Sequence, residues 1–277
     1  MVEVREWSRS DTARLLRAPT ADDDKYSRGV VALRTGSSAY PGAAVLGVEA
    51  AWRAGAGFVR FVGEQRVADA VLARRPETVT GPDVGATRVD AWVIGSGTDA
   101  AHRTAEEERH LRAILQGDAR VVVDAGALDL VDAAPTAPVV LTPHAGEFAR
   151  LRTRLDLPTG GERVDEAREV AAALGATVLL KGARTVIAAP DGEIIVVAAG
   201  TAWLSTAGTG DVLAGALGAV LAATPDASMA EAVAAGAWVH GHAARIAAGT
   251  LDGGVGRPIV ALDVALALPR AVADVLA

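Results

Sequence analysis

Short runs of β-branched residues alternate with alanine-rich stretches along most of the chain, and this alternation constrains the fold more than any other feature. The β-branched runs are solid blocks of apolar residues, as at 121–123, and lack the alternating polar residues of a strand with one exposed face. Apolar strands separated by helices predict a mostly parallel sheet covered by helices on both faces. We therefore expect a three-layer α/β/α fold.

Glycine and proline residues between the apolar runs mark the ends of the expected strands and helices. Strands, each with its following turn, are expected at 30–36, 58–63, 91–97, 120–128, 138–147 and 177–182, and a hairpin at 185–200. Helices are expected at 41–56, 101–116, 165–174, 210–222, 229–248 and 262–277. Residues 155–162 are expected to form a flexible loop. No repeat or linker divides the chain, so we expect one domain over 1–277, with 1–24 as an N-terminal extension.

Composition excludes several classes of protein. The net charge of −7 argues against nucleic acid or an anionic membrane as the main partner. The chain has no cysteine, which rules out disulfides, zinc–thiolate sites and thiol nucleophiles. Its N-terminus is rich in charge, and no uncharged apolar run is long enough to span a bilayer. We therefore expect a cytoplasmic protein with no membrane partner.

Polar residues gather where the predicted strands end in glycine turns. In open α/β sheets, ligands bind at the carboxyl ends of the strands, so these residues are candidates for a common site. They are Ser37, Ser38, Ser96, Asp124, His144, Glu147, Lys181 and Asp211.

The stretch TAGTGD, residues 206–211, is the strongest of these signals. Its glycines let the backbone approach a ligand closely, and Asp211 is followed by a helix that carries no other charge. Such a helix is expected to be buried, so that its first turn is the part that meets polar groups. A helix start attracts phosphates, and this predicts a phosphate-binding turn with a carboxylate beside it. The alternative is that Asp211 is an ordinary helix N-cap.

Two further strand ends have both a functional and a structural interpretation. Lys181, one of only two lysines, follows a strand and could reach a nucleotide phosphate, or it could be a solvated side chain. His144 and Glu147 stand at a helix start, where they could contact a ligand or simply cap the helix. His144, His240 and His242 lack the spacing of a metal-ligand cluster, and the segment 240–248 is expected to pack against the sheet.

Taken in order, these motifs resemble the ribokinase-like superfamily and, within it, the NAD(P)H-hydrate dehydratase family. GTGD alone would indicate only the superfamily, which includes vitamin and sugar kinases. The combination of TPHAGE at 142–147 with KGART at 181–185 is more specific. The resemblance runs from Lys25 to the C-terminus and also includes the stretches at 41–59, 93–99 and 122–128.

The resemblance implies a repair reaction on hydrated NADH or NADPH, with ADP (or ATP) as phosphoryl donor and Mg²⁺ on the phosphates. The ring hydroxyl is phosphorylated, and elimination of phosphate restores the reduced cofactor. Asp211 is then the general base. The resemblance implies an anion hole at Ala207, Gly208, Thr209 and Gly210, and nucleotide contacts at Lys181, Gly182, Ala183, Arg184, Thr185 and Gly210. It implies contacts with the hydrated dinucleotide at Ala43, Ala44, Gly97, His144 and Asp211.

The chain departs from the family pattern at three positions. Thr201 replaces the usual asparagine, Gly126 is the third residue of the DADAL-like motif, and Ala207 replaces a glycine. These changes affect the shape of the nucleotide pocket and leave the base in place. We expect a homo-oligomer and a separate NAD(P)H-hydrate epimerase in the same pathway. The alternatives are a small-molecule kinase for a pyrimidine or thiazole alcohol, and a non-catalytic sensor of adenine nucleotides.

Overall fold

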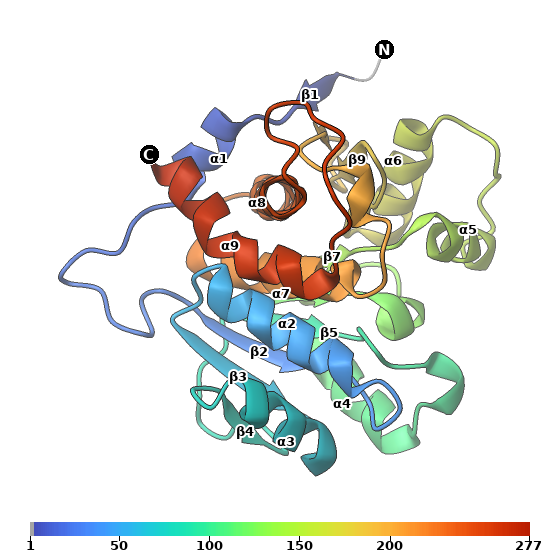
Figure 1. Cartoon of the computed structure of the whole chain (residues 1–277). Coiled ribbons are helices and arrows are strands. Elements are labelled where there is room, and N and C mark those ends of the chain that lie inside the picture. The colour runs from blue at the N-terminus through green and yellow to red at the C-terminus, as the bar shows by residue number, and fades with distance from the viewer. Residues whose placement is uncertain (1–2) are drawn as a thin grey trace.

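The computed structural model describes residues 3–277, and its framework is a single ten-stranded sheet (Figure 1). The strand order is β1-β10-β9-β8-β7-β6-β5-β2-β3-β4, and every pairing is parallel except those of β9 with β8 and β10. The strands are β1 (Val4–Glu6), β2 (Val30–Arg34), β3 (Phe58–Val62), β4 (Val79–Gly81), β5 (Ala91–Ile94), β6 (Arg120–Val123), β7 (Val139–Leu141), β8 (Thr177–Leu180), β9 (Thr185–Ala188) and β10 (Ile194–Val197). The expected α/β fold with a mostly parallel sheet is confirmed.

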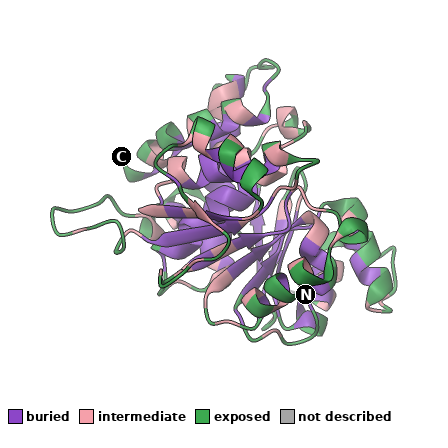
Figure 2. Ribbon diagram, turned by 90° about the horizontal axis from the view of Figure 1, so that it is seen from below, coloured by how far each residue is buried: buried purple, intermediate pink, exposed green. Residues whose placement is uncertain are grey.

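Helices cover both faces of the sheet, as a three-layer arrangement requires. The helices are α1 (Arg9–Leu15), α2 (Pro41–Arg53), α3 (Gln65–Arg74), α4 (Ala105–Leu115), α5 (Ala145–Arg154), α6 (Arg163–Leu174), α7 (Thr209–Ala223), α8 (Met229–Ala248) and α9 (Ala261–Leu276). One apolar core joins the sheet to α2, α3, α7, α8 and α9, and a second joins its other face to α4, α5 and α6. Figure 2 shows the strands buried between these outer helices.

Four elements were missed by the sequence prediction: β1, α1, α3 and β4. Both strands have only three residues and lie at the edges of the sheet, where none of their residues is buried and they show little apolar pattern. β1 pairs with β10, and α1 packs against α8 and α9, so the segment expected as an extension adds an edge strand to the sheet. The helix expected from residue 101 begins instead at Ala105, because the Thr104 side chain accepts a hydrogen bond from Glu107 N and starts a new helix there.

The topology determines where a ligand site can form. After β2 the chain adds β3 and β4 on one side, and then returns to add β5 and the later strands on the other side. The carboxyl ends of β2 and β5 therefore flank a switch point, which is the usual ligand site of an open α/β sheet.

Helix α7 is held at this edge by close packing. All of its residues except Gly210, Asp211 and Ala223 are buried, as the uncharged sequence predicted. It crosses α2 so closely that a Cβ atom added to Gly215 would lie 2.1 Å from the Gly47 carbonyl oxygen. The first turn of α7 is thus fixed against the sheet and α2, and it is the part of the helix that is left to meet a ligand.

Candidate active site

The turn that leads into α7 is rigid. Gly208 is the N-cap of the helix and has φ +87°, a left-handed conformation that favours glycine. The Thr209 hydroxyl donates to the carbonyl oxygens of Leu204 and Thr206, at 3.0 and 2.9 Å. The Thr209 carbonyl lies 3.0 Å from Nε2 of His240, a buried residue of α8. The four predicted anion-hole residues, 207–210, therefore form one ordered turn with the start of α7.

His240 supports this turn as a neutral side chain. Burial lowers the pKa of His240 to about 4, so the ring is uncharged near neutral pH and Nε2 donates its proton to the Thr209 carbonyl. The sequence prediction gave His240 only a packing role. The two residues are 31 positions apart, and no local spacing pattern relates them.

Asp211 is the third residue of α7 and is not its N-cap, so the structural alternative suggested by the sequence is wrong. Its side chain is mostly buried at the carboxyl edge of the sheet. Burial, followed by the negative charge of Asp124, raises the pKa of Asp211 to about 6. The Lys181 ammonium group and the Ser96 hydroxyl act in the opposite direction. A carboxylate with a raised pKa in a glycine-rich turn is well suited to accept a proton.

Asp124 links the ends of four neighbouring strands. Its Oδ1 accepts hydrogen bonds from Lys181 Nζ at 2.9 Å and from Thr142 Oγ1 at 2.8 Å, and its Oδ2 accepts one from Ser96 Oγ at 2.9 Å. The Asp124 side chain is only 5% exposed. The sequence analysis placed Ser96, Asp124 and Lys181 at strand ends but did not predict that they are bonded to one another, and it did not single out Thr142.

Lys181 connects this network to the start of α7. A Cβ atom added to Gly210 would lie 3.6 Å from Lys181 Nζ, so the ammonium group stands directly over the first turn. Of the remaining predicted nucleotide contacts, residues 182–184 are exposed and lie in the turn between β8 and β9, and Thr185 is the first residue of β9. Arg184 pairs with Glu6 of β1. Lys181 thus lies at the start of α7, and the turn that follows it in the chain is exposed.

Two of the predicted dinucleotide contacts, Ala43 and Ala44, lie near the start of α2 and pack against glycines. A Cβ atom on Gly97 would lie 2.3 Å from Ala43 Cβ, and one on Gly36 would lie 2.8 Å from Ala44 Cβ. Ala43 and Ala44 are both buried, with Ala44 fully so. The structure brings Ala43 and Gly97 together and shows that the Ala44 methyl group packs against Gly36.

His144 caps helix α5. Its Nδ1 accepts hydrogen bonds from the backbone N–H groups of Gly146 and Glu147, and the Glu147 carboxylate accepts one from His144 N at 2.8 Å. The capping interpretation is therefore confirmed, while the ring remains 58% exposed. Glu147 also lies 3.9 Å from Lys181 Nζ, which places the start of α5 beside the network around Asp124.

A cavity of about 440 Å³ opens beside this end of the sheet. Its lining includes Thr98, Gly126, Glu147 and Leu151. The departure from the family pattern at Gly126 has a local reason, because a Cβ atom there would lie 2.3 Å from the Thr98 carbonyl oxygen. Glycine lets the two loops approach each other next to the cavity.

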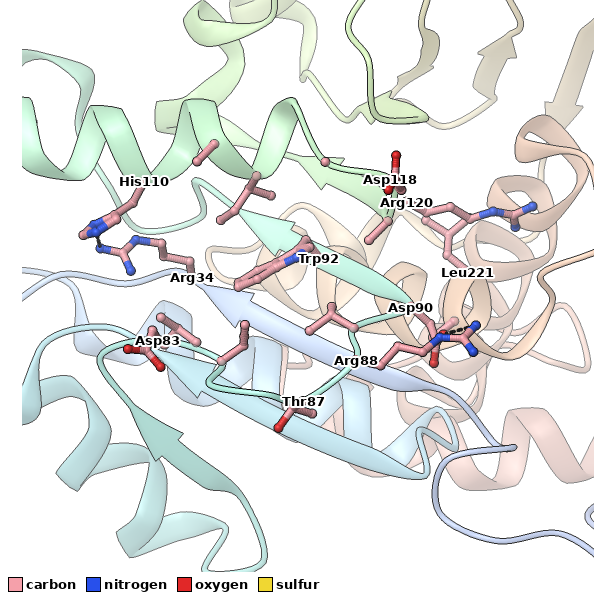
Figure 3. A pocket seen from close by; sticks show the side chains of 18 of the residues that line it. Arg34, Asp83, Thr87, Arg88, Asp90, Trp92, His110, Asp118, Arg120 and Leu221 are labelled. Carbon is pink, nitrogen blue, oxygen red and sulfur yellow. Dashed lines mark hydrogen bonds and ion pairs between the residues drawn. The ribbon is translucent and has the colours of Figure 1, made fainter.

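A second cavity, of about 750 Å³, lies on the other side of β5, between α4 and the loop 82–90 (Figure 3). Trp92 stands in its middle. The Arg120 guanidinium donates hydrogen bonds to the carbonyl oxygens of Thr224, Pro225 and Ala227. Arg34 pairs with Glu107 and Arg88 pairs with Asp90. Since these charges already have partners, this cavity is a weaker candidate for phosphate binding than the start of α7.

Within residues 3–277, no group of three or more histidine or acidic side chains could hold a metal ion. A metal in this site would therefore take most of its ligands from bound phosphates and water, as Mg²⁺ commonly does. None of the helices in the same part of the chain has the length and apolar character needed to cross a membrane.

The fold and the site together define a ribokinase-like protein: a parallel sheet with a glycine-rich helix start and an aspartate at its carboxyl edge. A solved structure supports this class over the whole chain. The ADP/ATP-dependent NAD(P)H-hydrate dehydratase of Bacillus subtilis, co-crystallised with ATP/Mg²⁺, superposes with a TM-score of 0.85 and is 28% identical, covering 99% of this chain and 100% of that one.

The chain belongs to the NAD(P)H-hydrate dehydratase family, whose model matches residues 31–253. It is 46% identical over 229 residues to the bifunctional NAD(P)H-hydrate repair enzyme Nnr of Mycobacterium tuberculosis, covering 79% of this chain and 46% of that protein. It is 37% identical over 260 residues to the ADP-dependent (S)-NAD(P)H-hydrate dehydratase of Neisseria meningitidis, covering 86% of each. The chain thus spans about half the length of the bifunctional relative. The resemblance predicted from the motifs is confirmed.

Proposed function

We propose that the protein catalyses the ADP-dependent dehydration of the S-epimer of hydrated NADH or NADPH. The observation that carries this proposal is the pairing, at the start of α7, of a mostly buried Asp211 with a lysine poised over Gly210. This arrangement offers a base for a hydroxyl group and a positive environment for a phosphoryl group in one place.

The chemistry follows from the weakness of hydroxide as a leaving group. Asp211 accepts the proton of the ring hydroxyl, and the oxygen attacks the β-phosphorus of ADP. The bond from that phosphorus to the bridging oxygen breaks, and AMP leaves. The phosphate now attached to the ring carbon then departs with its bonding electrons, the neighbouring carbon loses a proton, and the double bond of the reduced nicotinamide returns.

The residues of the turn have separate parts in this proposal. The backbone N–H groups of residues 207–210 stabilise the charge on the transferred phosphoryl group, as helix starts do. Lys181 and the turn 182–185 hold the nucleotide with Gly210. Mg²⁺, bound mainly by the phosphates, would neutralise part of their charge.

The hydrated dinucleotide is assigned to the opposite side of Asp211. The resemblance assigns Ala43, Ala44, Gly97 and His144 to the dinucleotide. The exposed ring of His144 lies 3.5 Å from the Glu147 carboxylate, and Glu147 lines the cavity of about 440 Å³. The relatives support the choice of substrate, since the protein from Neisseria meningitidis bears the name of this activity. A homo-oligomer and a separate epimerase partner stay predictions.

The direct test is to incubate the protein with the S-hydrate, ADP and Mg²⁺ and to follow the absorbance of the reduced cofactor. We expect recovery of NADH or NADPH and formation of one AMP per turnover. Absence of recovery with both ADP and ATP would overturn the proposal. Accumulation of a stable phosphorylated product of another alcohol would instead indicate a kinase.

A further inference from the structure

One face of helix α5 forms a wall of the cavity of about 440 Å³ beside the carboxyl edge of the sheet. Four residues at helical spacing line the cavity from this face: Glu147, Arg150, Leu151 and Arg154. The opposite wall comes from residues within 98–100 and 125–129, which follow β5 and β6. The cavity has the size of a site for a small organic ligand, and neither of its arginines has a part in the proposed reaction.

The cavity lies next to groups that are assigned to the reaction. Lys181 Nζ lies 3.6 Å from a Cβ atom added to Gly210 and 3.9 Å from the Glu147 carboxylate, so Lys181 joins the start of α7 to the cavity wall. Gly97, a predicted dinucleotide contact, immediately precedes Thr98 of the lining. A dinucleotide whose ring reacts at the start of α7 and that contacts Gly97 therefore has this cavity beside it for the rest of its length.

The Arg150 guanidinium is directed toward the start of α5. A Cβ atom added to Gly146 would lie 3.1 Å from His144 Cε1 and 3.9 Å from Arg150 Nη1. The guanidinium group therefore lies near the imidazole ring of His144, another predicted dinucleotide contact. Helical side chains lean toward the N-terminus of their helix, which explains why Arg150 reaches back by one turn.

The charges that lack a counter-charge in this cavity are positive. Each lining carboxylate has a partner: Asp129 with Arg103 at 2.6 Å, Asp99 with His102 at 2.8 Å, and Glu147 with the backbone N–H of His144 at 2.8 Å. Arg154 donates its hydrogen bonds to the carbonyl oxygens of Asp129 and Val131. Arg150 is exposed and, within residues 3–277, donates no hydrogen bond and forms no ion pair. Two guanidinium groups one helical turn apart therefore favour an anionic ligand.

We propose that Arg150 determines substrate specificity by binding a phosphate group of the hydrated dinucleotide in this cavity, with Arg154 as a second cation. This inference rests on the proposed function, which supplies the dinucleotide as the substrate. A guanidinium group binds phosphate oxygens through two parallel N–H···O hydrogen bonds, and this geometry fixes the ligand as well as holding it. The phosphate is either the pyrophosphate that both hydrates carry or the 2′-phosphate that only hydrated NADPH carries.

The test is calorimetric titration of the wild type and of Arg150→Gln with NADH and with NADPH, the products of the proposed reaction. AMP is present throughout, so that it occupies the nucleotide subsite. We expect at least one of the two dissociation constants to rise about ten- to a hundred-fold, the loss typical of a hydrogen bond to a charged group. A rise for both cofactors identifies the pyrophosphate as the bound group, and a rise for NADPH alone identifies the 2′-phosphate. Unchanged constants for both cofactors overturn the inference, and so does a wild type that binds neither.

Arg109→Gln is the matched control, because it also removes an exposed arginine from a helix, α4, but one outside the lining of the cavity. It should leave both dissociation constants in place, and a rise equal to that of Arg150→Gln would mean that only the total charge matters and overturn the inference. Arg150→Lys keeps the charge without the paired donors, so it should restore part of the affinity. The melting temperature should not change in Arg150→Gln, since an exposed side chain without partners is replaced. Weaker binding together with a lower melting temperature would indicate a structural role and contradict the inference.

Turnover with the two hydrates separates this inference from the proposed function. Arg150→Gln should raise KM for the hydrate whose product binds more weakly, while kcat and the KM for ADP stay nearly unchanged, because the phosphate is remote from the reacting ring. If the wild type binds NADH or NADPH but dehydrates neither hydrate, the proposed function fails while the calorimetry still decides the role of Arg150. If dehydration occurs and Arg150→Gln changes KM for neither hydrate, only the inference about Arg150 fails.

Discussion

Replacing Asp211 with asparagine should abolish turnover and at the same time stabilise the nucleotide-free protein at neutral pH. Asparagine has nearly the same shape, and the N-cap of α7 is Gly208, so no cap is lost at position 211. What disappears is a mostly buried carboxylate, whose pKa is raised by burial and then by the negative charge of Asp124. A residue that is unfavourable for folding and indispensable for the reaction is expected at an active site.

The size and sign of the stabilisation follow from the pKa. The Asp211 carboxyl titrates at about 6 in the folded protein against 3.8 for an ordinary aspartate, a difference that corresponds to about 3 kcal/mol. The folded state binds the proton more tightly, so the wild type loses stability as the pH rises from about 4 to about 6 and does not regain it above. Asp211→Asn avoids this loss. Its advantage should be near zero below pH 4 and up to about 3 kcal/mol at pH 7, which is several degrees in melting temperature.

The assay is thermal unfolding of both proteins from pH 4 to pH 8 without nucleotide, together with turnover and ADP affinity from the same preparations. Asp263→Asn is the matched control, since Asp263 also lies in the first turn of a helix but accepts a hydrogen bond from Val260 N at 2.9 Å. Asp263→Asn should not raise the melting temperature at any pH. If Asp211→Asn melts at a lower temperature than the wild type at pH 7, the ionised Asp211 carboxylate does not destabilise the folded protein as described. Turnover like that of the wild type would remove Asp211 from the mechanism.

Three further substitutions test the other parts of the site. Lys181→Ala should weaken ADP binding by about 1.5–3 kcal/mol in calorimetry and slow saturated turnover less, and unchanged ADP affinity would contradict the assignment. His144→Ala should raise the Michaelis constant for the hydrate and leave ADP affinity nearly unchanged. His144→Asn is the control, because asparagine retains the cap of α5. If the Michaelis constant rises only in the alanine variant, the cap alone matters. His240→Phe should reduce turnover and cost about 1–3 kcal/mol of unfolding free energy, because the Thr209 carbonyl loses its hydrogen-bond donor. Turnover like that of the wild type would show that the turn keeps its shape without this hydrogen bond.

The start of α7 could be predicted from the sequence because its signals are local. Two glycines, one carboxylate and an uncharged helix occupy adjacent positions, and each has a direct physical meaning. The parallel sheet could be predicted for a similar reason, since apolar strands and intervening helices follow one another along the chain. In the same way, Asp211 and Lys181 could be placed at strand ends or helix starts before their surroundings were known.

The contacts between strand ends could not be predicted, because they join residues far apart in the sequence. Asp124 and Lys181 are 57 positions apart, and Asp124 and Ser96 are 28 apart. Their meeting depends on the order β8-β7-β6-β5 in the sheet, which alternation alone does not determine. The edge strands β1 and β4 were missed for a different reason, since strands of three residues, none of them buried, carry almost no periodic signal.

The small residues at the start of α2 pack against the loops that follow β2 and β5. The family resemblance implies that Ala43 and Ala44 contact the dinucleotide, but in the structure they are in contact with Gly97 and Gly36. Gly42, which precedes them, faces free space, since a Cβ atom there would meet no atom within 4 Å. The alanines, together with the glycines at 36 and 97, therefore let α2 lie close to the ends of β2 and β5. A larger side chain at 36 or 97 would push α2 away from the switch point and alter the site without touching the base.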